Sequence, residues 1–273
     1  MNTSKQDKYY SVYRNRHSWI YHLAYMRLSK VLAALYAIEK QGLSLLDKSI
    51  LDYGFGAGTF FRYCPKECAL FGVELDAVNV EAVKRALGRM GYRQVDLRVI
   101  SEKEWQDHEL LTRQYDLIVA SHVLEHMEEP ALLMNRLLSC LTPQGCLLAV
   151  VPINEVVPHE SHVSVIERQV IEDWAQAVNA TIMDYRELDR FTYCARPILH
   201  KTSRVGRLFA QGVSLGLGIP AALLGARRWF ILDALFGRAT GAKPAQAVFL
   251  MRPHQARAFE PGDNGTEVQR EPT

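Results

Sequence analysis

The sequence predicts an α/β fold in which a mostly parallel β-sheet carries helices on both faces. Short apolar runs alternate along the chain with longer segments whose apolar residues recur every three or four positions. This is the pattern of buried strands that alternate with amphipathic helices. Three glycines on alternate positions directly follow the first of these runs. Because ligands of such sheets bind at the carboxyl ends of the strands, the glycines mark the candidate binding edge.

The expected elements follow one another in a regular order. Strands are expected at residues 49–54, 70–74, 95–100, 115–121, 145–152, 180–188 and 245–253. Helices are expected at residues 18–42, with Gly42 as the stop, and at 77–91, 130–141 and 164–179, the last opened by a capping box of Ser164 and Glu167. A further helix is expected to begin near Thr59, directly after the glycines.

The order of elements indicates one large domain with additions. Residues 1–47 form an N-terminal helical extension, residues 48–253 the main domain, and residues 254–273 a polar tail that is expected to be disordered. The extension mixes aromatic and basic residues. It therefore either covers the substrate as a lid or packs on the edge of the sheet.

Composition restricts the class of protein. The chain of 273 residues is 48% apolar and 23% charged, with a net charge of +2, which is ordinary for a globular protein and too small to imply a nucleic-acid partner. Its five cysteines are scattered and form neither a disulfide framework nor a zinc pattern. The N-terminus shows no signal peptide, so a cytoplasmic location is expected.

The three glycines, Gly54, Gly56 and Gly58, follow a strand run that includes Asp52. Glycine is needed where φ is positive or where the backbone passes close beneath a ligand. The free N–H groups of a following helix also attract negative or lone-pair atoms. A dinucleotide-binding G-x-G-x-x-G motif would require glycine at position 59, where threonine stands. The spacing therefore disfavours a nicotinamide oxidoreductase.

Glu74 ends the next strand, where a carboxylate can accept hydrogen bonds from both ribose hydroxyls of an adenosine. The segments "LDYGFGAGTF", "GVELD" and "YDLIVASHVLEHMEEPALLMNRLLSCLTPQGCLLAVVP" together resemble the class I S-adenosylmethionine (SAM)-dependent methyltransferases, in the branch of the ubiquinone-biosynthesis O-methyltransferases. The resemblance covers residues 48–180 and departs from the common pattern at Phe55 and Gln144. It implies a Rossmann-like class I methyltransferase fold with a seven-stranded sheet, and SAM as the cofactor.

The resemblance also assigns residues to the cofactor. Asp52, Gly54, Gly56 and Gly58 would hold the methionine part, Glu74 the ribose, Leu75 the adenine face and Glu102 the adenine amino group, while His122 would face the pocket. Ser101 competes with Glu102 for its role, and a solvated surface acid is an equal alternative for Glu102.

Four histidines are candidates for the base that deprotonates an acceptor hydroxyl, a step that supplies roughly 10²–10⁴-fold in rate. They are His122, His126, His159 and His162. His162 is the preferred base, and His126 is either catalytic or structural. His159 and His162 are one residue too close for the H-E-x-x-H motif, so no metal site is expected.

Residues 200–243 form an apolar insertion before the last strand. Residues 208–226 carry no charge but are interrupted by glycines and a proline, and basic residues stand on both sides. A simple membrane crossing would separate the last strand from its sheet. We therefore expect a helical hairpin that lies on an anionic membrane surface, lines a tunnel for a greasy substrate, or forms a dimer interface. Trp229, Phe230 and Phe236 are expected at the headgroup level.

The sequence thus predicts an enzyme that transfers a methyl group from SAM to a small-molecule or lipid-linked acceptor, most readily at oxygen. Such an in-line displacement needs alignment of the acceptor more than a strong catalytic motif. We expect a cytoplasmic protein, with a peripheral position at the inner face of the membrane as one reading of the insertion. The alternative is a SAM-fold protein without catalysis that acts as a membrane-associated scaffold or regulatory subunit, although an intact glycine loop with Glu74 argues against it.

Overall fold

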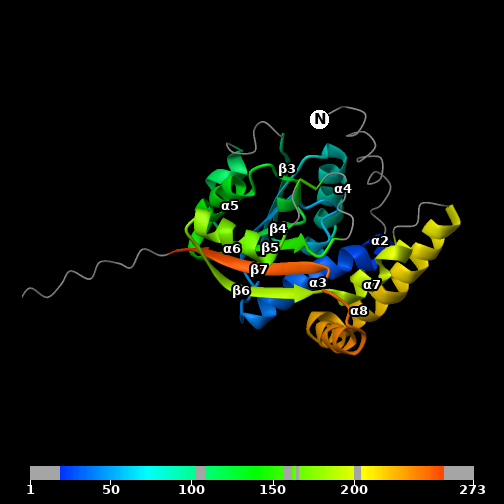
Figure 1. The fold of residues 1–273 in the computed structure, drawn as a ribbon. Helices are drawn as coiled ribbons and strands as arrows, with labels where there is room; N and C mark the ends of the chain where they lie inside the picture. The colour runs from blue at the N-terminus through cyan, green and yellow to red at the C-terminus, as the bar shows by residue number, and fades with distance from the viewer. Residues whose placement is uncertain (1–18, 102–107, 156–161, 164–165, 200–203, 255–273) are drawn as a thin grey trace, which may run out of the picture.

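A computed structural model describes residues 19–101, 108–155, 162–163, 166–199 and 204–254 of the chain (Figure 1). Its centre is a seven-stranded sheet with the strand order β3-β2-β1-β4-β5-β7-β6. The strands are β1 (Ser49–Tyr53), β2 (Ala69–Glu74), β3 (Gln94–Val99), β4 (Tyr115–Ser121), β5 (Leu141–Pro152), β6 (Ala180–Leu188) and β7 (Gln246–Pro253). All pairs are parallel except those of β7, which runs antiparallel to both neighbours. The predicted mostly parallel sheet is therefore confirmed.

Helices cover both faces of this sheet, as strands that are apolar on both faces require. They are α2 (Trp19–Leu23), α3 (Tyr25–Lys40), α4 (Ala77–Gly88), α5 (Pro130–Ser139), α6 (Arg168–Ala177), α7 (Arg190–Leu199) and α8 (Arg204–Thr240). One core joins α3, α4 and α8 to one face, with Tyr25, Val83 and Phe230 among its buried side chains. A second core joins α5 and α6 to the other face through Leu133 and Ile171.

The carboxyl ends of β1, β2 and β4 meet at one edge of the sheet. β1 lies between the other two strands and is parallel to both. Tyr53, the last residue of β1, pairs with Val73 of β2 and with Ala120 of β4. The glycine loop, Glu74 and the turn after Ser121 are therefore neighbours in space, as the order of elements predicts.

The helix expected near Thr59 is shorter than predicted. In the described residues between β1 and β2, a 3₁₀ helix occupies Phe60–Tyr63, and Cys64 is already extended at φ −76° and ψ 146°. Pro65 explains this end, because proline disfavours helical backbone in the residue before it. The glycine loop therefore has no long α-helix behind it.

Two other predicted helix ends have different outcomes. α3 ends as predicted, since Gly42 at φ 64° follows the C-cap residue Gln41. The predicted capping box at α6 is wrong, because the helix begins at Arg168 and Glu167 is its N-cap residue, without a side-chain cap bond. Its partner Ser164 lies outside the described residues.

α8 is the predicted apolar insertion, and it consists of two helices at an angle (yellow and orange in Figure 1). Gly225 breaks the helical path with φ 73° and ψ 169°. The first half packs on the junction of α2 and α3, where a Cβ on Gly218 would lie 1.8 Å from the carbonyl oxygen of Leu23, so glycine is needed. Trp229 and Phe230 in the second half are buried in the core. The prediction that these two rings lie at a membrane surface is therefore wrong.

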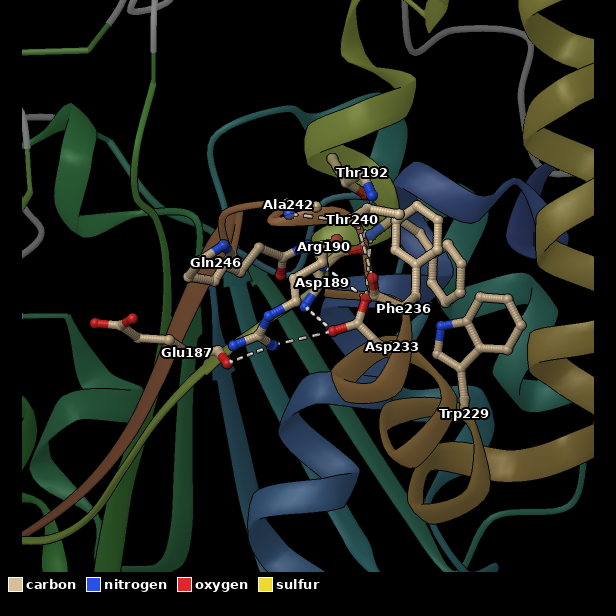
Figure 2. Close-up of polar contacts among 12 residues, drawn as sticks. Glu187, Asp189, Arg190, Thr192, Trp229, Asp233, Phe236, Thr240, Ala242 and Gln246 are labelled. Atoms are coloured by element: carbon tan, nitrogen blue, oxygen red, sulfur yellow. Dashed lines mark hydrogen bonds and ion pairs between the residues drawn. The ribbon is translucent and has the colours of Figure 1, made fainter. Parts of the chain in front are cut away.

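A carboxylate of α8, Asp233, lies at the first turn of α7 (Figure 2). It accepts hydrogen bonds from three consecutive backbone N–H groups, those of Asp189, Arg190 and Phe191, at 3.1, 2.6 and 3.1 Å. The Arg190 guanidinium adds an ion pair at 3.3 Å. Because free N–H groups at a helix start need acceptors, α8 stabilises α7 as a cap supplied from another element.

The same network reaches α3 and explains why Trp229 is buried. Trp229 donates its indole N–H to the Tyr25 hydroxyl at 3.0 Å, and Tyr25 donates to Asp189 at 2.7 Å. Gln246 at the start of β7 donates to Asp189 and to Ser29. With its polar atom satisfied, the indole ring is free to pack in the core.

Candidate functional site

The glycine loop uses its three glycines in two different ways. Gly54, Gly56 and Gly58 have φ of 72°, 54° and 66°, a region that other residues rarely adopt. A Cβ on Gly54 would lie 2.7 Å from Val123, and one on Gly58 would lie 2.5 Å from Val83. A Cβ on Gly56 would meet no atom within 4 Å. Gly54 and Gly58 therefore permit close packing, whereas Gly56 leaves space open beside the loop.

Glu74 lies against the glycine loop at the end of β2. Its carboxylate accepts hydrogen bonds from the backbone N–H groups of Gly56 at 2.7 Å, Leu75 at 2.9 Å and Asp76 at 3.3 Å. Burial raises the pKa of Glu74, and these three donors oppose the shift. An acceptor with two oxygens is thus fixed at the loop, as binding of two ribose hydroxyls requires.

Asp52 is the charged residue of β1, and it is only 3% exposed. Burial, together with the charge of Glu74, raises its pKa to about 8. The carboxyl group is therefore largely protonated at neutral pH. A positively charged ligand group beside it would favour ionisation, so the position suits a cationic ligand.

A cavity of about 320 Å³ opens at this edge of the sheet. Seven residues predicted from the sequence line it, namely Asp52, Gly54, Gly56, Glu74, His122, His126 and His162. Gly58 packs on Val83 instead, and Leu75 is 43% exposed and is not part of the lining. Glu102 and His159 lie outside the described residues.

The turn after β4 holds a buried ionisable pair. His122 has left-handed backbone with φ 57°. Its Nδ1 lies 3.0 Å from Oε1 of Glu125, whose side chain is fully buried. Burial lowers the pKa of His122, Lys30 acts in the same direction, and Glu125 opposes the shift. Unusual backbone at a buried pair with a perturbed pKa is typical of functional sites.

His162 follows β5 in the chain but joins the same cluster. The backbone N–H of Val163 donates to the carbonyl oxygen of Glu125 at 2.8 Å, which ties this segment to the turn after β4. Nδ1 of His162 lies 2.6 Å from Oε2 of Glu155. The rings of His126 and His162 are 5.0 Å apart at an interplanar angle of 67°. The two predicted catalytic histidines are therefore in contact.

Sequence analysis missed two cationic residues of this cavity. Arg27 and Lys30 line it from α3, and the Arg27 guanidinium lies 3.4 Å from the centroid of the Tyr21 ring. Burial lowers the pKa of Lys30 to about 8, against the opposing charge of Glu125. A signal was present, because the two residues lie three apart on a helix with many buried positions, where charged side chains are uncommon.

Comparison with known proteins identifies the family. A family model described as a methyltransferase domain matches residues 20–195, which is more than half of the chain. A ubiquinone biosynthesis O-methyltransferase from Histophilus somni (strain 2336) is 25% identical over 115 residues, which are 40% of this chain and 47% of that relative. The aligned part thus spans about half the length of this curated relative.

Several solved structures share the fold at low sequence identity. Coclaurine N-methyltransferase, bound to N-methylheliamine and SAH, has a TM-score of 0.54 at 13% identity, over 83% of this chain and 73% of its own. An S-adenosylmethionine-dependent methyltransferase from Clostridium acetobutylicum ATCC 824 has 0.50 at 8%, over 82% and 91%. The 4+2 cyclase SpnF has 0.52 at 16%, over 81% and 79%. These likenesses show the fold alone, which also serves other chemistry.

The chain is a member of the methyltransferase-domain family and has the Rossmann-like fold of the class I enzymes. The cofactor of such an enzyme is SAM, and three observations of this chain fit it. Gly56 leaves open space beside its backbone, Glu74 fixes a two-oxygen acceptor there, and the buried Asp52 lines the same cavity.

Proposed function

We propose that this protein transfers the methyl group of SAM to an oxygen atom of a small amphiphilic or lipid-linked acceptor. The observation that carries the proposal is a single cavity with two kinds of lining. The glycine loop and Glu74 suit the cofactor, and the cluster of Glu125, His126 and His162 suits activation of an acceptor. Both kinds of residue must share one space for methyl transfer to occur.

Methyl transfer requires the protein mainly to align the acceptor atom with the methyl group. SAM supplies a methyl group on a sulfonium. The new C–O bond forms as the C–S bond breaks, and the electron pair of the C–S bond stays on sulfur. We assign activation of the acceptor hydroxyl to His162. The Glu155 carboxylate accepts from its Nδ1 at 2.6 Å, which leaves the lone pair on Nε2. In the simplest mechanism this nitrogen takes the hydroxyl proton.

The wall formed by α3 favours an acceptor that carries negative charge. Arg27 and Lys30 both line the cavity, and a guanidinium and an ammonium there would pair with a carboxylate or phosphate on the acceptor. The relative from Histophilus somni is described as an O-methyltransferase. Together these points favour an oxygen acceptor with an acidic group.

We further propose that the acceptor is met at an anionic membrane surface, because both halves of α8 leave apolar side chains exposed. Six of its apolar residues are 44–81% exposed, namely Phe209, Ile219, Leu223, Ile231, Leu232 and Leu235. Arg227 and Arg228 begin the second half of α8 and Arg238 stands near its end, and all three are exposed. Apolar area bounded by cations is what an anionic bilayer attracts.

α8 suits a position on the membrane better than a crossing. Of the helices in the described part of the chain, the segment Phe209–Thr240 is the one long and apolar enough to span a bilayer. The bend at Gly225 divides that length. β6 and β7, which flank α8, also pair in one sheet, so both ends of the insertion are held on the same side.

Transfer of a labelled methyl group tests the reaction. Purified protein is incubated with methyl-labelled SAM and with lipid and polar extracts, and the labelled product is analysed by mass. His162→Ala should lower turnover far more than SAM affinity, while His254→Ala, a change on the surface, should alter neither. Equal losses of turnover and affinity in His162→Ala would mark that residue as structural. SAM binding without transfer to any acceptor would favour the non-catalytic scaffold.

A further inference from the structure

We propose that Glu125, His126 and His162 form a binding site for a divalent transition-metal ion. One ligand atom from each residue lies within 4.8 Å of the others. Small shifts of these side chains would therefore bring all three donors onto one ion. Two imidazoles and one carboxylate suit Zn²⁺, Mn²⁺ or Fe²⁺ better than Ca²⁺ or Mg²⁺, which prefer oxygen ligands. The three residues also line the cavity of the glycine loop.

The burial of Glu125 is the first observation behind this site. Its side chain is fully buried, and within the described part of the chain Oε2 has no hydrogen-bond partner. Nδ1 of His122 lies 3.0 Å from the other oxygen, Oε1, a contact that is an ion pair only when the imidazole is protonated. Buried carboxylates are normally paired or bound to a metal. The contact with His122 leaves the second oxygen without a partner, and a cation in the cluster would satisfy it.

The contact behind His162 is the second observation. Oε2 of Glu155 lies 2.6 Å from Nδ1 of His162, and the two side chains are only 15% and 9% exposed. Metal-binding histidines almost always donate their other N–H to a carboxylate, carbonyl or water, which fixes the tautomer and makes the ligating nitrogen more basic. Glu155 would perform this function for His162.

The role of the ion rests on the proposed function, although its binding does not. An ion at the cluster would coordinate the acceptor hydroxyl and lower its pKa. The hydroxyl proton then passes to water before the oxygen attacks the methyl group. With the ion bound, His162 is a ligand, so the base role assigned to it above applies to the metal-free site. Acceptors with a second oxygen beside the hydroxyl would bind the ion best.

The sequence-based expectation of no metal site concerned His159 and His162, whose spacing does not match the H-E-x-x-H motif. The proposed ligands come instead from two separate segments, one after β4 and one after β5. These strands are parallel neighbours, so their carboxyl ends bring the segments together. That proximity is invisible in a motif read along the chain.

Calorimetric titration of the full chain with Zn²⁺, after treatment with a chelator and without SAM, tests the site. We expect one equivalent to bind the wild type and none to bind this site in His126→Ala or His162→Ala. Glu155→Gln should weaken binding by about 10–100-fold, because it removes the carboxylate behind a ligand. His254→Ala, which removes a surface histidine close to Thr181, should bind as the wild type does.

A second readout separates loss of a ligand from loss of the fold. Each variant is titrated with SAM, and Co²⁺ is used as a visible-absorption probe of the coordinated site. Lys30→Met should strengthen Zn²⁺ binding, since it removes a positive charge from the same cavity.

The metal site is refuted if the wild type takes up no stoichiometric Zn²⁺, or if His126→Ala and His162→Ala bind it unchanged. Wild type that binds SAM but not Zn²⁺ overturns the metal site and leaves the proposed function standing. Wild type that binds Zn²⁺ but not SAM overturns the proposed function instead.

Discussion

At Gly56, a positive φ of 54° coincides with open space where a side chain would project. Gly91 has a similar φ of 73° and equally open surroundings, but it does not line the cavity. The two positions therefore separate the cost of backbone strain from the cost of filling the cofactor space. They allow the role of one glycine in the loop to be measured directly.

Gly56→Val should abolish SAM binding, because its branched side chain would occupy the space that the cofactor needs. Gly91→Val should leave SAM affinity unchanged. Both variants should lose about 1–2 kcal/mol of stability from the unfavourable φ. Calorimetric titration with SAM and urea unfolding measure the two effects. SAM affinity that is unchanged in Gly56→Val would remove the cofactor assignment of the loop.

The carboxyl group of Asp52 should make stability depend on pH. Its pKa is about 8 in the folded protein, against 3.8 for an ordinary aspartate. Between about pH 4 and pH 8 the folded protein therefore holds a proton that the unfolded chain has released, and the free energy of unfolding falls as pH rises. Asp52→Asn cannot ionise, so it should lose that part of the decline. Urea unfolding of both proteins across this window is the measurement, and equal pH slopes would contradict the assignment.

Residues that belong to a local motif were within reach of sequence analysis. Gly54, Gly56 and Glu74 lie in two short segments whose chemistry depends on neighbours along the chain. Lys30 and Glu155 were missed, because Lys30 lines the cavity from α3 and Glu155 pairs with His162 after β5, and no local motif joins either residue to the glycine loop. Their roles depend on how helices and loops meet at the edge of the sheet.

The cap that α8 supplies to α7 is an interaction between two helices. Asp233→Ala would leave the backbone N–H groups of α7 without their acceptor and Arg190 without its partner. We expect a loss of about 2–3 kcal/mol in the free energy of unfolding, as for hydrogen bonds to a charged group at a cap. Asp233→Asn keeps one acceptor oxygen and should recover part of the loss. Equal, small effects of both changes in urea unfolding would show that the cap is unimportant.

Strands were easier to predict than helix ends. The strand expected at residues 180–188 is β6 itself, because an apolar and β-branched run between turn signals is a local property. The helix after the glycines is shorter than the glycine motif predicts, because Pro65 ends it. Trp229 was assigned to a membrane because its neighbours are basic, and only the position of Tyr25 shows that its indole is satisfied inside.

At the scale of the whole molecule, the exposed side of α8 should attach the protein to anionic vesicles. Arg227→Glu with Arg228→Glu should weaken binding, because each basic residue near such a surface adds about 1 kcal/mol. This electrostatic part of the binding should weaken as the salt concentration rises. Ile231→Ser with Leu235→Ser should reduce the apolar contribution to vesicle binding, which salt does not affect. Co-sedimentation with vesicles of phosphatidylserine and phosphatidylcholine, at low and high salt, measures both.

A matched control for this assay is Arg85→Glu with Arg89→Glu, which changes net charge equally at the exposed C-terminal end of α4. It should bind vesicles nearly as well as the wild type does. A protein that ignores vesicles, yet forms a dimer that Leu223→Glu dissociates, would instead identify the apolar side of α8 as a subunit interface.

α3 contacts both the cofactor cavity and the helix α8. Lys30 lines the cofactor cavity, while Tyr25 and Tyr36 pack on Trp229 and Phe230 of α8 with ring centroids 5.5 Å apart in both pairs. A ligand that orders this helix at one surface lowers the entropic cost of binding at the other. Linkage makes the coupling reciprocal, so vesicles should tighten SAM binding by the same factor by which SAM tightens vesicle binding. The cofactor would then be loaded preferentially where a membrane-borne acceptor is found.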